Sequence, residues 1–295
     1  MDYDVLNKLS YTSMKDEQKK LLRKILDDVA LVDELNKLNI DETTIENNLA
    51  TISAFADDFH TCNNCKGLET CPKRPKGTKI KLVNLGKIIE RQIAECELKK
   101  EQNKIDNHYI YNDFPTRFKY VNINDIDVHS LDYIGELASN IANGIKDDSG
   151  TWIYVLGASN NRKIQSVAGI VNQIVLDSDI EVASVSTSNL IKRLSDLFFK
   201  DKNRFDVEFD NLCQIPILVF LDFGDEYKNE SSRDNVFIPL LRERKNRGVT
   251  IFISAFSAKE VAEMYSLSYA SKPRVKQIQD MFKNSIKIDF GPLDI

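Results

Sequence analysis

Four cysteines in the first third of the chain have the spacing of metal ligands. Cys62, Cys65, Cys71 and Cys96 follow the pattern C-x2-C-x5-C-x24-C. Two thiols separated by two residues can bind one metal ion from a tight turn, and two more can complete a tetrahedron. Lysine-rich flanks favour the thiolate form that binds metal. The spacing therefore predicts a structural zinc site, for which His60 is an alternative ligand and unconnected thiols are the competing interpretation.

A second candidate site is a loop that could bind phosphate. Residues 157–164 read GASNNRKI and compare with the nucleotide-binding pattern GxxxxGK[ST]. Gly157 and Lys163 stand at the expected positions, but Arg162 replaces the second glycine and Ile164 replaces the hydroxyl that holds Mg²⁺. An arginine is also poorly suited to a positive-φ backbone if the loop needs one. The loop predicts a reduced site for ATP or ADP with little catalytic power.

An apolar strand that ends in acid would complete such a site. Residues 217–226 read ILVFLDFGDE, so Asp222 follows the strand and could hold Mg²⁺ through water. Phe223 stands where a second acid often follows. Either motif alone is also explained by an ordinary loop or a buried strand with an acidic turn. As a pair at the ends of two strands, they indicate P-loop ancestry.

The elements that must position these residues change character along the chain. Apolar residues at three- and four-residue steps predict helices in residues 1–58, whereas residues 60–80 have the composition of loops and turns. From residue 130 onward, apolar strands alternate with helices, which predicts a mostly parallel sheet covered on both faces. Strands are expected at 152–156, 182–185, 215–222, 249–255 and 286–288. Helices are expected at 131–143, 164–176, 187–199, 233–247 and from 259.

Composition restricts where the protein works and what it binds. The net charge of −5 argues against broad binding of nucleic acid, although residues 72–104 hold ten Lys or Arg against four Asp or Glu. The odd count of five cysteines argues against a disulfide framework. No apolar run is long enough for a membrane helix, and the N-terminus lacks the pattern of a secretion signal. We expect a cytoplasmic protein without a membrane span, in which Cys213 is a core residue.

The two parts together resemble the DnaI family of bacterial primosomal proteins, which are AAA+ loaders of the replicative helicase. The resemblance covers nearly the whole chain and rests on the CNNC…C…EC pattern with its basic tail and on the stretches VASVSTSNLIKRLSD, LDFGDE and TIFISAFSAKEV. It implies a helical, zinc-binding, helicase-interaction domain at 1–105, a linker at 106–125 and an AAA+ P-loop domain at 126–295. The family has a histidine near the position of Lys79, which leaves Cys71 as the fourth ligand here.

The chain departs from the family at the positions that perform ATP hydrolysis. The family has a complete GxxxxGK[ST] loop, two aspartates after the acidic strand, a sensing asparagine and late arginines. The last three matching positions hold Ala255, Gln277 and Met281, with Arg274 close by. Phosphoryl transfer depends on positioning and charge neutralisation by these parts. The departures therefore predict negligible hydrolysis of ATP.

The resemblance implies a helicase-loading adaptor in DNA replication whose partner is the replicative helicase. Two other functions stay open at this point. One is an active AAA+ ATPase with a divergent loop, because Gly157, Lys163 and Asp222 survive. The other is a zinc-dependent regulator that binds nucleic acid through the cysteine module and its basic segment. Contact with single-stranded DNA and self-association are further expectations.

Overall fold

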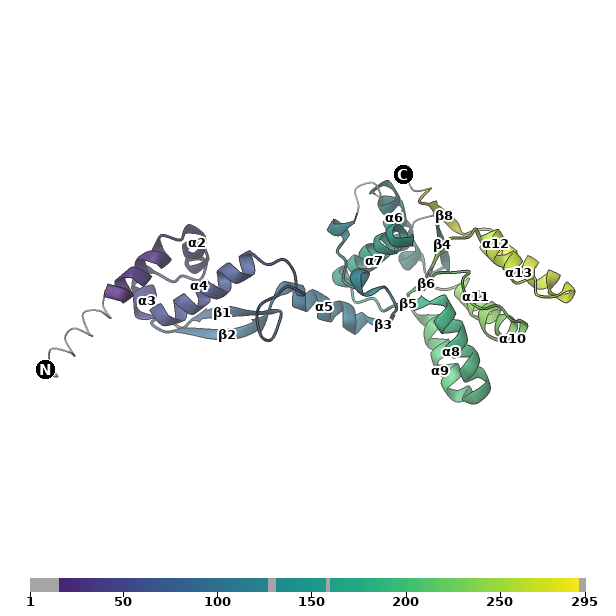
Figure 1. The fold of residues 1–295 in the computed structure, drawn as a ribbon, viewed down its shortest axis with the longest axis horizontal. Coiled ribbons are helices and arrows are strands. Elements are labelled where there is room, and N and C mark those ends of the chain that lie inside the picture. Colours follow the sequence, from purple (N-terminus) through teal and green to yellow (C-terminus); the bar gives the residue numbers. More distant parts are fainter. Residues whose placement is uncertain (1–15, 127–130, 158–159, 292–295) are drawn as a thin grey trace, which may run out of the picture. The chain divides into compact units, whose positions relative to one another are not determined.

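The computed structural model describes residues 16–126, 131–157 and 160–291 (Figure 1). The chain divides after Gln102 into two compact units, and unit 2 begins at Asn103. Helix α5 (Glu97–His108) spans this division. The cysteines other than Cys213 belong to unit 1, whereas the candidate nucleotide loop belongs to unit 2.

Short capped helices make up most of the described part of unit 1. Residues 16–26 are helical, and α2 (Val29–Lys37), α3 (Glu42–Asn47) and α4 (Leu49–Asn63) follow. The carboxylate of Asp28 accepts a hydrogen bond from the Leu31 N–H at 3.1 Å, and that of Asp41 accepts one from the Thr44 N–H at 2.8 Å. These side chains satisfy backbone donors that have no partner within the first turn, so they fix where α2 and α3 begin.

A β-hairpin completes unit 1 and was not part of the predicted helical domain. Strand β1 (Thr78–Asn84) pairs antiparallel with β2 (Ile89–Glu95). Leu82 and Ile89 pack into the same core as the helical residues Ile52 and Phe55. Leu82 is buried while its neighbour Lys81 is exposed, and such alternation lets one face of a strand pack while the other meets water. The N-terminal domain is therefore mixed α and β.

Unit 2 is built on a parallel six-stranded sheet. The strand order is β3-β5-β6-β7-β4-β8, and every neighbouring pair is parallel. The strands are β3 (Tyr109–Asn112), β4 (Thr151–Leu156), β5 (Val182–Ser186), β6 (Ile217–Leu221), β7 (Val249–Ile253) and β8 (Ile286–Asp289). The predicted α/β class with a parallel sheet is confirmed.

Helices cover both faces of this sheet, which gives three layers (Figure 1). Along β4, Ile153 and Val155 face one core, whereas Trp152 and Tyr154 face the other. The first core contains the end of α5 with α6 (Leu131–Asp147) and α7 (Asn160–Asp177). The second contains α8 (Thr187–Lys200), α9 (Lys202–Gln214), α11 (Ile238–Arg244), α12 (Ala258–Met264) and α13 (Lys272–Phe282). Shorter turns are η1 (Thr116–Phe118), η2 (Ile123–Asp125), α10 (Glu230–Ser232), the π-helical η4 (Arg233–Phe237) and η5 (Tyr269–Ser271).

The predicted linker at 106–125 is wrong, because the whole segment belongs to unit 2. Tyr109 begins the edge strand β3, which pairs with β5. Phe114 and Phe118 are buried in the first core, and the Tyr109 hydroxyl donates to Asn172 on α7 at 2.9 Å. Burial of large aromatic rings contributes more to stability than exposure in a linker would. The polar residues between the rings gave the misleading linker composition.

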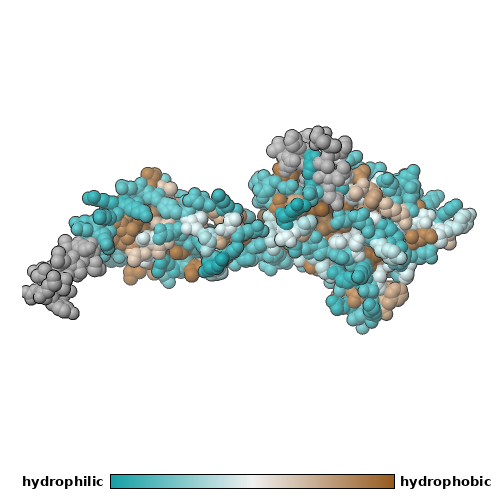
Figure 2. All heavy atoms as spheres, in the orientation of Figure 1, coloured by the Kyte–Doolittle hydropathy of each residue, from teal (hydrophilic) through white to brown (hydrophobic). Residues whose placement is uncertain are grey.

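Hydrophilic residues cover most of the face of each unit shown in Figure 2, and the apolar residues on that face are scattered. Within the described residues, every helix is too short or too polar to span a bilayer. A scattered apolar surface is ordinary for folded chains and identifies no binding site by itself.

Candidate functional site

The candidate nucleotide site lies at the carboxyl edge of the sheet in unit 2. Strands β4 and β7 are neighbours, but the chain leaves β4 toward β5 on one side and leaves β7 toward β8 on the other. Ligands of open parallel sheets bind at such a switch point, beyond the carboxyl ends of the strands. Gly157, Asp222 and Ser254 directly follow β4, β6 and β7. The fold therefore brings the two halves of the predicted site to one edge.

The Lys163 ammonium at this edge is fully buried and bonded to the backbone. Its Nζ donates to the carbonyl of Gly157 at 2.6 Å and also to the carbonyl of Ser254. Burial lowers the pKa of Lys163 from 10.5 to about 8, while the negative charges of Asp222, Asp289 and Asp225 act in the opposite direction. In this arrangement the lysine ties the end of β4 to the end of β7.

Arg162 lies in the first turns of α7, which begins at Asn160. Its backbone is helical, and the positive-φ residues other than glycine among the described ones are Asn39, Asp148 and Asp222. No positive φ is needed at Arg162, because the helix starts before the position of the second glycine. A phosphate loop offers N–H groups that point inward, and helix formation from residue 160 leaves fewer loop residues for that purpose.

The start of the loop depends on a glycine. Gly157 has φ of +142°, and a Cβ atom there would lie 2.9 Å from the Cβ of Phe290. Phe290 is buried and stacks on Tyr133 with ring centroids 4.9 Å apart. Only glycine combines this backbone angle with so close a contact. Residues 158–159 of the predicted loop lie outside the described residues.

Asp222 is held in an unusual backbone conformation at the end of β6. Its φ is +51°, a region that residues with a Cβ atom seldom adopt. The next residue is anchored, because the Phe223 N–H donates to the Ile253 carbonyl at 2.8 Å and the Ser254 hydroxyl donates to the Phe223 carbonyl. Strain of this kind persists where surrounding contacts enforce it, and it is common at ligand sites.

Two positions of the predicted site hold apolar side chains that pack in the cores of unit 2. Phe223, at the position of a second acid, is fully buried, and its ring lies 4.8 Å from that of Phe252 and 5.6 Å from that of Phe282. Ile164, at the position of the Mg²⁺-binding hydroxyl, is 5% exposed and belongs to the opposite core. Neither side chain offers an oxygen atom, so neither could join the carboxylate of Asp222 in binding Mg²⁺.

The late positions that the resemblance singles out lie in three different environments. Met281 is buried in the second core, and Ala255 is exposed directly after Ser254. Gln277 accepts a hydrogen bond from Arg274 at 3.1 Å. Arg274 in turn pairs with Asp234 through an Nε–Oδ1 distance of 3.3 Å. Through this ion pair, α13 contacts the π-helical turn at 233–237.

The four predicted zinc ligands of unit 1 line one cavity of about 670 Å³. Cys62 lies in the last turn of α4, Cys96 directly follows β2, and Cys65 and Cys71 lie in the intervening loop. Among the residues that the structure describes, no three His, Cys, Asp or Glu side chains are close enough together to hold a metal ion. The four thiols therefore line one cavity but are too far apart to bind a single metal ion in this arrangement.

Hydrogen-bond donors lie close to three of these thiols. Backbone hydrogen bonds from Gly77 and Lys73 lower the pKa of Cys71. The Gly67 N–H lies 3.4 Å from Cys65 Sγ, and Lys73 Nζ donates to Cys62 Sγ at 2.9 Å. Such donors stabilise metal-bound thiolates and orient them. Four cysteine thiols with such hydrogen-bond donors suit zinc as ligands, but they would have to approach one another to bind one ion.

The two alternative ligand positions are engaged elsewhere. His60 Nε2 lies 2.8 Å from Asp28 Oδ2, at the start of α2. Lys79 Nζ lies 2.9 Å from Glu97 Oε1. Neither contact points to a metal, so the cysteines remain the better ligand candidates.

One comparison with known proteins spans most of the chain. The replicative helicase loader DnaI of Bacillus subtilis (strain 168) is 23% identical over 242 residues, which cover 79% of this chain and 76% of that protein. The chain is therefore similar in sequence to DnaI over most of its length. Because unit 2 contains under two thirds of the residues, a match over 79% of the chain extends into unit 1.

Solved structures of replication proteins are also similar to this chain. A crystal structure of DnaI covers 63% of this chain and 96% of its own length, with a TM-score of 0.48 and 19% identity. A crystal structure of the DnaC helicase loader covers 59% of this chain and 99% of its own length, with a TM-score of 0.45 and 17% identity. No protein-family model matches the chain.

The sequence patterns predicted Gly157, Lys163 and Asp222 for this site but gave no indication of Ser254. The carbonyl of Ser254 receives the Lys163 ammonium, and its hydroxyl fixes the residue after Asp222. The only signal in the sequence is the position of Ser254 at the end of an apolar strand. Every residue has a backbone carbonyl, so the residue type at position 254 could not predict this contact.

Proposed function

We propose that this chain is a helicase-loading adaptor that binds the replicative helicase and hydrolyses ATP slowly or not at all. The observation that carries the proposal is the sequence relationship to DnaI, because it extends over both units and not over the P-loop-like unit alone. A fold shared only in unit 2 would be compatible with many functions.

Slow hydrolysis is the second part of the proposal, and it is supported by the carboxyl edge of the sheet. Transfer of the γ-phosphoryl group requires Mg²⁺ ligands and cations placed against the phosphates. Ile164 and Phe223 are core residues, and the Lys163 ammonium is bonded to two carbonyls. ATP or ADP would bind only if Lys163 exchanged these bonds for phosphate contacts.

An ATPase assay on the full chain tests this part. We expect a rate indistinguishable from that of the Lys163→Ala variant, with Lys276→Ala as a control for the loss of an exposed lysine. A turnover number of about 1 per second or more that Lys163→Ala abolishes would show an active ATPase instead. Weak binding of nucleotide without turnover agrees with the proposal.

We further propose that Cys62, Cys65, Cys71 and Cys96 hold one structural zinc ion. The shared cavity and the donors to the thiols support this assignment. Zinc would cross-link the end of α4 to the hairpin and so contribute folding free energy to a small unit. Elemental analysis of protein purified without added metal should give about one zinc per chain.

A matched pair of variants makes the zinc test specific. Cys65→Ser should lose the metal and lower the melting temperature of unit 1, whereas Cys213→Ser in unit 2 should keep the metal. Only a trace of zinc in the wild type, with the four thiols freely reactive, would reject the assignment. The helicase proposal does not depend on this result.

Helicase binding is tested with two fragments that both keep α5 whole. Fragment 1–108 should retain the replicative helicase of the same organism in a pull-down, and fragment 97–295 should retain less. Circular dichroism of each fragment checks that it is folded. If only fragment 97–295 retains helicase, the docking surface has been assigned to the wrong unit.

Binding to nucleic acid through the basic segment is the competing function. Residues 72–104 carry the excess of Lys and Arg, but Lys73, Lys79 and Lys100 already pair with acidic side chains. If neither fragment binds helicase and the full chain binds DNA with a steep dependence on salt, the regulator function replaces the adaptor function.

A further inference from the structure

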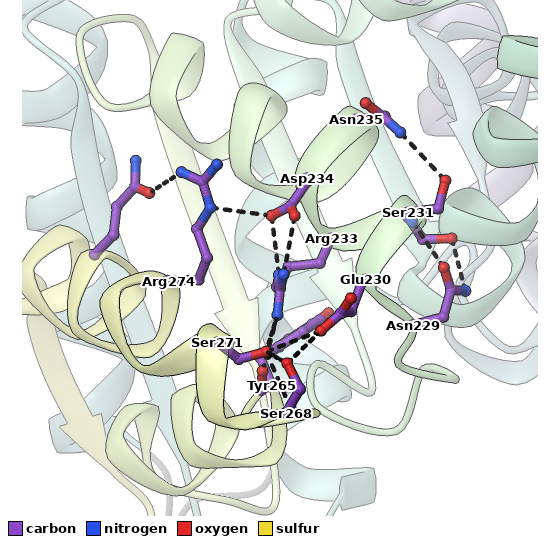
Figure 3. A network of polar contacts seen from close by, with 12 residues as sticks. Asn229, Glu230, Ser231, Arg233, Asp234, Asn235, Tyr265, Ser268, Ser271 and Arg274 are labelled. Atoms are coloured by element: carbon purple, nitrogen blue, oxygen red, sulfur yellow. Dashed lines mark hydrogen bonds and ion pairs between the residues drawn. The ribbon is translucent and has the colours of Figure 1, made fainter.

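A polar network joins two segments of unit 2 that lie far apart in the sequence (Figure 3). One segment contains α10 and the π-helical turn η4, which follow the loop after Asp222. The other contains the end of α12, η5 and the start of α13. Turns of π-helix are rare and frequently mark functional positions.

Arg233 is the centre of this network. Its side chain is 4% exposed, and its Nε and Nη2 atoms each donate to the carboxylate of Asp234 at 2.9 Å. Its Nη1 atom donates to the Ser271 hydroxyl at 2.7 Å and to the Tyr265 carbonyl at 3.3 Å. One guanidinium thus binds its own helical turn and the α12–α13 connection at the same time. The planar fork of arginine is suited to such bidentate pairing.

Two acidic side chains add further links in the same direction. Glu230 Oε1 accepts a hydrogen bond from the Ser268 hydroxyl at 2.6 Å. Glu226 is buried and accepts one from the Tyr265 hydroxyl at 2.7 Å, and its other oxygen accepts the Gly224 N–H at 2.9 Å. The rings of Phe237 and Tyr265 also stack, with centroids 4.8 Å apart. The α12–α13 segment is therefore fastened by ionic, hydrogen-bonded and aromatic contacts.

The same contacts reach back to the candidate nucleotide site. Glu226 lies four residues after Asp222, and its bond to the Gly224 N–H fixes the loop between them. Because Glu226 also binds the Tyr265 hydroxyl, the position of this loop is coupled to the position of α12–α13. Each of these contacts joins two groups of the chain itself.

We propose that Arg233, Glu226 and Glu230 form an internal latch that holds α12–α13 and the Asp222 loop in one fixed arrangement without nucleotide. Bonds to buried charged groups are costly to break, because the partner left behind stays unpaired. The latch would make the shape of unit 2 independent of ATP. This inference concerns conformation and stands whether or not the chain binds helicase.

Hydrogen exchange of the full chain tests the latch. Amides of α12 and α13 should exchange at least about tenfold faster in Arg233→Met than in wild type, while those of β4 and α7 stay unchanged. Arg242→Met, which removes an exposed arginine from the neighbouring helix α11, should have no such effect. Addition of ATP or ADP to the wild type should leave the exchange of α13 unchanged.

Two outcomes would overturn the latch. One is unchanged exchange of α12 and α13 in a folded Arg233→Met variant. The other is slower exchange of α13 in the wild type when nucleotide is added, because the helix would then depend on the ligand. If Arg233→Met does not fold, Ser271→Ala removes the Arg233–Ser271 bond with a small change in volume. The same local increase in exchange is expected for that variant.

Discussion

Replacement of Lys163 by methionine tests whether this lysine serves the fold. Its buried ammonium donates to the carbonyls of Gly157 and Ser254, and burial lowers its pKa from 10.5 to about 8. Between these two pKa values the unfolded chain binds more protons at Lys163 than the folded chain does. The free energy of unfolding therefore rises with pH in this window.

The magnitude follows from the same numbers. A pKa lowered from 10.5 to about 8 corresponds to about 3 kcal/mol against the folded state at pH 7. Hydrogen bonds from a charged donor contribute about 1.5–3 kcal/mol each and offset this cost. The two bonds together offset all of this cost and exceed it by at most about 3 kcal/mol, so Lys163→Met should lower the free energy of unfolding by no more than about 3 kcal/mol at pH 7. Between pH 7 and pH 9.5 the wild type should gain about 2 kcal/mol that the variant lacks.

Urea unfolding at both pH values measures this difference. The fluorescence of Trp152, the single tryptophan of the chain, reports on β4 in unit 2. Lys276→Met, which removes an exposed lysine from α13, is the control and should follow the wild type at both pH values. An equal difference between wild type and Lys163→Met at pH 7 and pH 9.5 would refute the reasoning.

Three further experiments probe unit 2. Arg244 is fully buried and donates to the carbonyls of Cys213, Ile215 and Val249. Arg244→Met should therefore lower the free energy of unfolding in urea by about 3–5 kcal/mol, and a loss below about 1 kcal/mol would contradict this. Phe223→Asp places an unpaired carboxylate among aromatic rings and should destabilise unit 2 by about 3–5 kcal/mol without restoring ATP hydrolysis. A stable variant that hydrolyses ATP would contradict this prediction. Burial raises the pKa of Cys213 to about 12, so mass spectrometry should find it unmodified by iodoacetamide at pH 8 until the chain is unfolded.

The strands of unit 2 were predictable because they are strongly apolar. The stretches around β4, β6 and β7 are buried on both faces, and such strands read as continuous apolar runs. Their carboxyl ends then had to meet at one edge, which placed Gly157 and Asp222 together. The hairpin and β3 were missed because polar residues interrupt their short apolar patterns. Helices α9 and α13 were missed for a similar reason, since both are highly charged.

Details of the candidate site could not be predicted because they depend on contacts between distant residues. Lys163 binds a carbonyl 91 residues away, and Arg233 binds a hydroxyl 38 residues away. Residue types alone suggested that Lys163 faces a phosphate and that Arg162 sits in a loop. Where α7 begins is decided by packing of the whole unit, and local sequence gives only a weak preference for it.

Binding to the replicative helicase is the property on which the proposed function depends. Isothermal titration of the full chain into purified replicative helicase of the same organism, without added nucleotide, measures this directly. We expect a saturable complex with a defined stoichiometry. No detectable complex at any ratio, with both proteins folded, would contradict it.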